Sequence, residues 1–160
     1  MKPIYRTINL RPNILQFVIN ELPLLSLCPI GLLYGGMEGM PFQSLVVFIT
    51  LILTLMLVYR FIYIRRIRYH IESEQLVYEH GILQRKVDYV ELYRVVDFKE
   101  HQSLMQQIAG LKTVTIFSGD RTSPKMDLIG MIYYEDIVSV IRERVEYNKQ
   151  RKGVYEITNR

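Results

Sequence analysis

The sequence predicts an α+β protein in which two membrane-spanning helices precede an antiparallel β domain that ends in one α-helix. Three observations support this fold class. Residues 42–59 carry no charge, and four arginines follow by residue 68. From residue 69 to residue 132, apolar and polar residues alternate in short runs, as half-buried strands require. After residue 133, the apolar positions recur at helical spacing instead.

Charge is distributed unevenly along the 160 residues, whose net charge is +4. Of the 20 basic and 16 acidic residues, seven basic and two acidic lie in residues 1–68, and 13 basic and 14 acidic follow. The positive excess therefore flanks the apolar segments, where it sets membrane orientation. The near-neutral remainder argues against nucleic-acid binding. The single cysteine, Cys28, excludes an intramolecular disulfide and a cysteine-based metal site.

The first apolar segment predicts a helix over residues 12–34, with Pro12 in its first turn. Polar residues interrupt this segment, and Pro23 and Pro29 follow them. Two geometries fit the pattern. The whole segment crosses the bilayer with a proline kink, or residues 13–21 lie in the interface and the crossing starts near Leu22. The full crossing is the preferred interpretation.

The second apolar segment predicts a helix over residues 42–64 that continues to Arg68. Eighteen residues at ~1.5 Å each come close to the roughly 30 Å hydrocarbon core. The loop at residues 35–41 carries no Lys or Arg, whereas basic residues lie at the other ends of both helices: Lys2, Arg6, Arg11, Arg60, Arg65, Arg66 and Arg68. Residues 1–68 are thus predicted to form a hairpin anchor with both chain ends in the cytoplasm.

The predicted β domain covers residues 69–150. Strands are expected at residues 69–73, 75–80, 82–90, 92–99, 113–117 and 125–132. A helical turn is expected at residues 103–111, with Leu104 and Met105 in the core. One face of the final helix carries Tyr134, Ile137, Val138, Ile141 and Val145. Basic residues late in that helix, including Arg144, complement its dipole. Residues 151–160 form a polar tail.

This order of elements resembles bacterial PH-like (pleckstrin-homology-like) proteins in which a transmembrane hairpin precedes the domain. The segments that carry the resemblance are LVYEHGILQRK at residues 76–86, VELYRVVD at 90–97, QIAGLKTV at 107–114 and DLIG at 127–130. It covers about residues 70–147. It implies an antiparallel β-barrel or sandwich capped by a C-terminal α-helix, in a multi-pass protein of the bacterial inner (plasma) membrane. It also implies a binding or scaffolding module without catalytic activity or a cofactor of its own.

Basic residues near the membrane exit are candidate ligands for anionic headgroups. The candidates are Arg60, Arg65, Arg66, Arg68, Arg85, Lys86 and Arg94. Arg85, Lys86 and Arg94 are predicted to lie on neighbouring strands, where they could form a second basic face toward the bilayer. A topology signal and a solvated strand face are the alternative interpretations. Two carboxylates at residues 72–75 disfavour phosphoinositide recognition at that turn.

Asn20 and Glu21 are the candidate polar contact inside the membrane, because an ionisable residue in a span usually faces a partner or water. Alternatively, Glu21 lies nearer the interface. No catalytic residue or metal ligand is predicted. The three histidines, His70, His80 and His101, have no metal-ligand spacing, and no glycine-rich phosphate loop occurs.

The favoured function is a non-enzymatic module at the cytoplasmic face that acts through protein–protein contacts in a membrane assembly. Its expected partners are the bilayer and a membrane or cytoplasmic protein, and a homo-oligomer is compatible with the sequence. An open sheet edge or a groove beside the final helix would receive an extended peptide. The alternative is a module that binds anionic lipid in lipid handling or envelope stress. A third hypothesis is a membrane enzyme or transport subunit built around Glu21.

Overall fold

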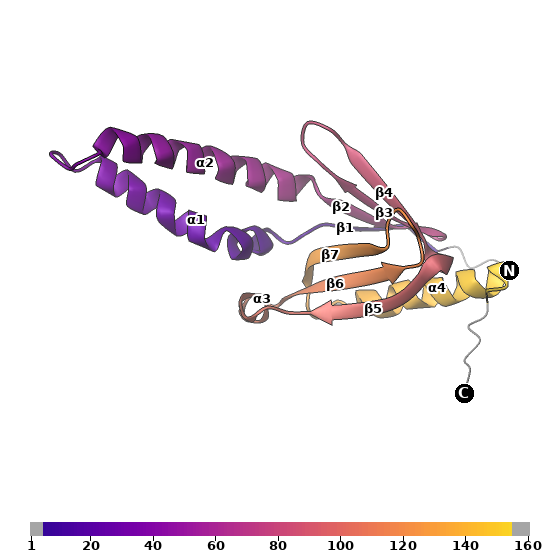
Figure 1. The fold of residues 1–160 in the computed structure, drawn as a ribbon. Coiled ribbons are helices and arrows are strands. Elements are labelled where there is room, and N and C mark those ends of the chain that lie inside the picture. The colour runs from indigo at the N-terminus through magenta and orange to yellow at the C-terminus, as the bar shows by residue number, and fades with distance from the viewer. Residues whose placement is uncertain (1–4, 155–160) are drawn as a thin grey trace.

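The computed structural model describes residues 5–154 and consists of a helical hairpin that projects from a β domain (Figure 1). Lys2 and the last part of the expected tail, residues 155–160, lie outside the described residues. The elements are, in order, β1 (Ile8–Leu10), α1 (Ile14–Gly35), α2 (Gln43–Arg66), β2 (Arg68–Ile71), β3 (Gln75–His80), β4 (Lys86–Glu91), the 3-10 helix η1 (Leu92–Arg94), β5 (Val95–His101), α3 (Leu104–Ile108), β6 (Leu111–Ser118), β7 (Lys125–Ile132) and α4 (Ile137–Lys152). The predicted α+β class is confirmed.

The helices α1 and α2 pack against each other and are long and apolar enough to cross a membrane. In their most apolar windows, only 17% and 11% of the residues are buried inside the protein. A core helix of a soluble domain would bury most of its apolar residues. The exposed apolar surface of this hairpin is therefore of the kind that lipid covers.

The ends of the hairpin differ from the sequence expectation. The side chain of Asn13 accepts the Leu15 N–H at 3.0 Å, so Asn13 is the N-cap and α1 begins at Ile14. Pro12 therefore precedes the helix, and its expected place in the first turn is wrong. At the other end, Ile67 has an extended backbone and Arg68 begins β2. The expected continuation of the second helix to Arg68 is also wrong.

The strands form two antiparallel sheets, in the orders β1-β2-β3-β4 and β5-β6-β7. They share one core and are not closed into a barrel, so the sandwich form of the expected fold is the one observed. The Tyr69 hydroxyl joins the sheets, because it donates to the Asp127 carbonyl at 2.9 Å and accepts the Ile129 N–H at 3.3 Å. Burial raises the pKa of this phenol.

The strand β1 was not predicted. It pairs with β2 in antiparallel register, with Ile8 opposite Ile71 and Leu10 opposite Tyr69. The segments that enter and leave the helical hairpin are therefore neighbours in one sheet. Three residues are too few for an alternating pattern to stand out in a sequence.

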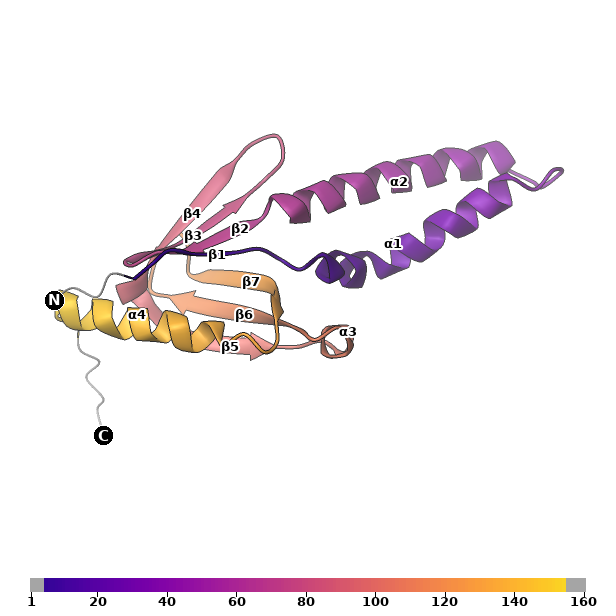
Figure 2. The same ribbon diagram turned by 180° about the vertical axis from the view of Figure 1, so that it is seen from behind.

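The final helix packs on the core as expected, but it starts later (Figure 2). Asp136 is its N-cap and accepts the Ser139 N–H at 3.1 Å. Tyr134 therefore precedes the helix and is 88% exposed, so its predicted place on the buried face is wrong. The remaining apolar positions of that face lie in or against the core: Ile137, Val138, Ile141 and Val145. The helix extends to Lys152, beyond the expected boundary at residue 150.

The predicted strands 75–80 and 125–132 are confirmed as β3 and β7, and three other predictions need correction. Residues 82–85 form a loop, and β4 starts only at Lys86. The expected strand 92–99 begins instead with η1, and β5 follows it. Leu104 and Met105 do not lie in the core: they are 67% and 42% exposed on α3.

Candidate functional site

The first turns of α1 are held against the β domain by amide groups. Asn13 donates its N–H to the Gly130 carbonyl of β7 at 3.0 Å. The Gln106 side chain on α3 donates to the Gln16 side chain at 2.8 Å, and both residues are buried. Gln16 in turn donates to the Asn20 side chain at 2.7 Å. The β domain therefore covers part of residues 13–20, whereas Ile14, Leu15 and Val18 remain exposed.

Gly130 makes this close approach possible. Its φ is +64°, and a Cβ at this position would lie 2.7 Å from the Cβ of Gln16. The β6–β7 register shifts nearby, between Lys112 and Val114, as is typical of a glycine bulge. Any larger residue would therefore combine backbone strain with a clash against α1.

Glu21 contacts α2 of the same chain. Arg60 Nη1 lies 2.7 Å and 2.9 Å from the two carboxylate oxygens of Glu21. The Glu21 side chain is 8% exposed, whereas that of Arg60 is 49% exposed. Because the Glu21 carboxylate neutralises its charge, Arg60 is a weaker candidate for headgroup binding than an arginine without a paired carboxylate. Glu21 therefore has a charged partner on the neighbouring helix of the same chain.

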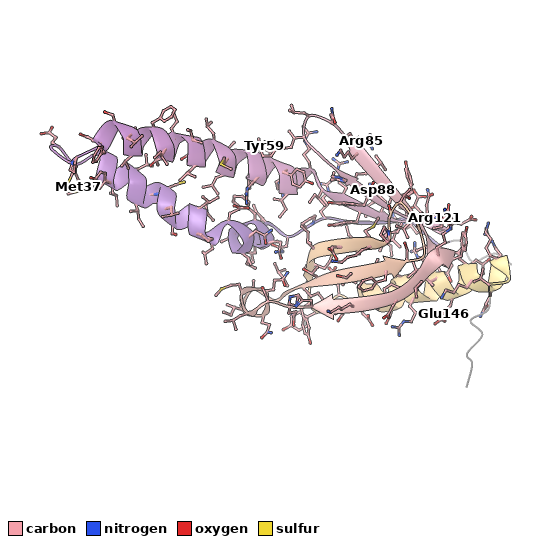
Figure 3. The ribbon with its side chains drawn as sticks, viewed as in Figure 1. Met37, Tyr59, Arg85, Asp88, Arg121 and Glu146 are labelled. Carbon is pink, nitrogen blue, oxygen red and sulfur yellow. The ribbon has the colours of Figure 1, made fainter. Side chains whose placement is uncertain are left out.

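Arg66, Arg68 and Arg85 line one cavity of about 250 Å³ beside the end of α2, with Glu79 and His80. Figure 3 shows Arg85 on the β3–β4 hairpin, on the side of the domain from which α2 extends. Arg85 forms an ion pair with Glu79 at 2.6 Å. The cavity thus holds three cations and one carboxylate, and it has the charge to attract an anion.

The other basic candidates surround this cavity or lie apart from it. Lys86 begins β4 directly after Arg85, and Arg65 is exposed in the last turn of α2. Arg94 lies in η1, beside Asp120 at 3.6 Å in the β6–β7 loop. Figure 3 shows Arg121, in that same loop, on the far side of the domain from the hairpin. The prediction that Arg85, Lys86 and Arg94 share one face is therefore wrong, because Arg85 and Lys86 lie at the start of β4 and Arg94 lies beyond its other end.

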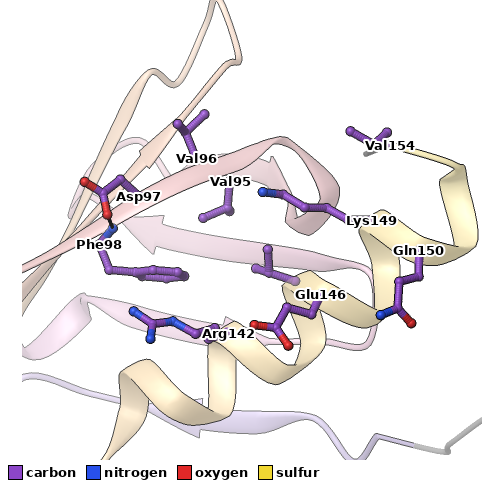
Figure 4. Close-up of a pocket in the computed structure, with 10 residues that line it drawn as sticks. Val95, Val96, Asp97, Phe98, Arg142, Glu146, Lys149, Gln150 and Val154 are labelled. Carbon is purple, nitrogen blue, oxygen red and sulfur yellow. Dashed lines mark hydrogen bonds between the residues drawn. The ribbon is translucent and has the colours of Figure 1, made fainter. Parts of the chain in front are cut away.

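A groove of about 360 Å³ runs between β5 and α4 (Figure 4). It is lined by Val95, Val96, Asp97, Phe98, Arg142, Val145, Glu146, Lys149, Gln150 and Val154. Val96 is 66% exposed, and within residues 5–154 β5 pairs with β6 alone. The Asp97 side chain accepts the Phe98 N–H at 2.7 Å, which occupies one main-chain donor of this edge strand. Such a groove offers apolar contacts, both signs of charge and an unpaired strand edge.

Arg144 is a buried residue whose contacts sequence reasoning missed. It donates to the carbonyls of Ile71, Glu72 and Arg6 at 2.7–2.9 Å, and burial lowers the pKa of its guanidinium. A signal was present in the sequence, because Arg144 follows Ile141 by three positions and so lies on the apolar face of the helix. It ties α4 to the chain before and after the hairpin.

No three His, Cys, Asp or Glu side chains among residues 5–154 come together in a group that could hold a metal ion. The histidines have other contacts. His70 Nδ1 lies 2.6 Å from the Asn9 side chain, and the His80 ring stacks on Tyr78 with centroids 4.5 Å apart. These contacts belong to the packing of β1, β2 and β3.

The family model of the bacterial PH domain matches residues 18–145. The chain belongs to this family. The match begins within α1 and ends within α4, so in this bacterial PH domain protein it includes both helices of the hairpin as well as the two sheets. PH-like domains are generally non-catalytic binding modules. Comparison with the curated proteins and with the solved structures found no significant match.

Proposed function

We propose that this bacterial PH domain protein is a membrane-anchored, non-enzymatic module that binds a partner protein at the cytoplasmic face of the inner membrane. The groove between β5 and α4 is the observation that carries the proposal. It joins an unpaired strand edge to a helix, and both elements contribute residues to the hydrophobic core. Grooves of this kind receive an extended peptide as an added strand.

The proposed orientation follows from charge. Arg6 and Arg11 precede α1, and Arg65 and Arg66 end α2, whereas the loop between the helices carries one charge, that of Glu38. A basic excess beside the helix ends is typical of the cytoplasmic side. Both chain ends and the β domain would then lie in the cytoplasm.

Reporter fusions test this orientation. A reporter that works only in the cytoplasm should be active when it is fused after Arg160 and inactive when it is inserted in the loop at residues 36–41. The reverse pattern would place the β domain outside the cell and contradict the proposal.

The groove also indicates the chemistry of the partner segment. Val95 and Val145 provide an apolar floor, while Arg142 and Glu146 place opposite charges along its α4 side. The Asp97 carboxylate must release the Phe98 N–H before a carbonyl of an added strand can accept a hydrogen bond from it. We expect an extended segment with alternating apolar and polar residues, because every second side chain of such a strand points toward the groove.

A photo-crosslinking amino acid at Val96 tests the groove in living cells. It should capture a distinct protein partner, whereas the same probe at Tyr89 should not. Tyr89 is a suitable control because it is 54% exposed but lies on β4 in the other sheet. The change Val96→Arg should also release the captured partner in a gentle-detergent purification, and Tyr89→Arg should retain it. Equal retention by both variants would contradict the groove as the binding site.

An anionic-lipid module is the second candidate function, and the cavity lined by Arg66, Arg68 and Arg85 favours it. Native mass spectrometry of the full chain tests it. Under this hypothesis, the wild type retains anionic lipid, and the double variant Arg85→Glu, Lys86→Glu loses it. Arg94→Glu is the matched control, since Arg94 lies at the far side of the domain. If neither the wild type nor the control retains anionic lipid, the lipid hypothesis fails.

A further inference from the structure

The short helix α3 exposes three large apolar side chains. Leu104, Met105 and Ile108 are 67%, 42% and 76% exposed. The segment around them, residues 102–111, carries no charged residue. A capping box between Ser103 and Gln106 fixes the helix, so these side chains are held outward by an ordered element. An uncharged apolar patch of this kind requires something to cover it.

The position of α3 indicates what covers this patch. Gln106 is hydrogen-bonded to Gln16 at 2.8 Å, so α3 lies beside the first turns of α1. Figures 1 and 2 show α3 level with these turns along the axis of the hairpin. The same turns of α1 expose Ile14, Leu15 and Val18. The apolar patch of α3 thus continues the exposed apolar surface of the hairpin.

Another exposed apolar residue, outside α3, lies near the end of α2. Leu83, in the loop between β3 and β4, is 94% exposed. Arg85 and Lys86 follow it after Gln84. Figure 1 shows this loop extending to the level of the last turns of α2. An apolar side chain beside two cations suits the boundary between acyl chains and phosphates.

From these positions we propose that α3 and the β3–β4 loop both insert into the interface of the cytoplasmic leaflet, where the hairpin enters it. The partner of this surface is the lipid bilayer. Leu104, Met105, Ile108 and Leu83 enter the acyl boundary, while Arg85 and Lys86 remain at the phosphates. This inference rests on the membrane insertion of the hairpin under the proposed function. It adds that the β domain contacts the membrane directly, in addition to being linked to it through the helices.

Lipid fits both patches better than a protein partner does. They lie at the same level as the ends of the membrane-length helices and therefore in the plane where the bilayer surface would pass. The α3 segment is uncharged over ten residues, and an interfacial segment tolerates this because lipid covers it. The groove proposed for a protein partner lies elsewhere, between β5 and α4.

Tryptophan fluorescence of the full chain tests this inference, since the sequence contains no tryptophan. The chain is reconstituted in vesicles of phosphatidylethanolamine and phosphatidylglycerol whose acyl chains are brominated near the headgroup. Three variants probe the surface: Ile108→Trp, Leu104→Trp and Leu83→Trp. Leu55→Trp, 62% exposed in the middle of α2, reports the span, and Val96→Trp, 66% exposed on β5, reports the aqueous side.

We expect the three surface variants to lose most of their emission to the brominated lipid and to resist quenching by aqueous iodide. Val96→Trp should behave in the opposite way. Two results overturn the inference: iodide quenching of the surface variants as strong as that of Val96→Trp, or shielding from iodide without quenching by lipid, which would indicate a protein cover. If lipid brominated along the chain quenches Leu55→Trp but lipid brominated near the headgroup does not quench the surface variants, this inference fails alone. If Leu55→Trp is not quenched by lipid brominated along the chain, the membrane anchor of the proposed function fails as well.

Discussion

At the scale of single residues, polar groups in this protein join segments that are distant in sequence. Arg144 contacts main-chain carbonyls on both sides of the hairpin, and Gln106 reaches Gln16 across 90 positions. Glu21 is paired with Arg60 on the neighbouring helix. Such buried groups are costly when a partner is lost, so each gives a sharp mutational test.

The change Arg144→Leu should destabilise the β domain by about 3 kcal/mol, because it leaves three main-chain carbonyls without their donor. The measurement is chemical unfolding of the full chain in detergent. Arg142→Leu removes the same charge from an exposed position two residues earlier and should change stability little. Equal losses in both variants would show that charge, and not these hydrogen bonds, is responsible.

A double-mutant cycle tests the pair of Glu21 and Arg60. The change Arg60→Leu should destabilise the hairpin in the wild type but much less in a Glu21→Gln background, where no buried carboxylate is left unpaired. Since Arg60 is half exposed, we expect a coupling of about 1 kcal/mol. Additive effects of the two changes would mean that the ion pair contributes nothing to stability.

Sequence reasoning at this scale identified the residues more easily than their partners. The cost of a charge in an apolar span singled out Glu21, but nothing in the sequence specified Arg60, because that contact depends on the rotation of two helices. Leu104 and Met105 were assigned to the core since apolar residues usually are. The sequence does not show that α3 lies beside the first turns of α1. The spacing of Arg144 from Ile141 indicated that Arg144 lies on the buried face of the helix, but its charge suggested an exposed position.

At the scale of elements, the contact between α1 and β7 depends on Gly130. The change Gly130→Ala should cost about 1 kcal/mol for the left-handed backbone and roughly 1–3 kcal/mol more for the clash with Gln16. Gly153→Ala is the matched control, because Gly153 has a φ of +67° and open space around it. Thermal unfolding of both variants measures the difference. If Gly153→Ala costs as much, α1 can move away from β7 freely.

The alternation of apolar and polar residues, together with the glycines, predicted most of the strands. The boundaries that were predicted wrongly share a physical cause. The strands β3 and β7 follow a clear period of two and were located correctly. In the segment 82–99, apolar and β-branched residues continue through a loop and through η1, so the pattern does not mark where pairing begins. In the folded protein η1 packs against α4, which is distant from it in the sequence. Local propensity cannot report such contacts.

At the scale of the whole molecule, the two flanks of the hairpin meet in one sheet. Under the proposed membrane anchor, that sheet depends on how the chain crosses the membrane. Deleting residues 13–35 leaves one span and should place β1 and β2 on opposite sides of the bilayer. We expect the β domain of this variant to be cleaved rapidly in limited proteolysis of membrane vesicles. Replacing residues 22–35 by the same number of leucines preserves the crossing and should preserve protection. A protected domain in the deletion variant would show that β1 is dispensable.

Pairing between β1 and β2 also sets an order in time during synthesis. Residues 8–10 leave the ribosome before their partner strand β2, which follows some 60 residues later, after both helices. At 5–20 residues per second, β1 waits roughly 3–12 seconds for β2. Because β1 has only three residues, it offers little edge for wrong pairing during this interval. The last strands and α4 emerge later still, so Arg144 can bind the Arg6 carbonyl only when the two ends of the domain are already in place.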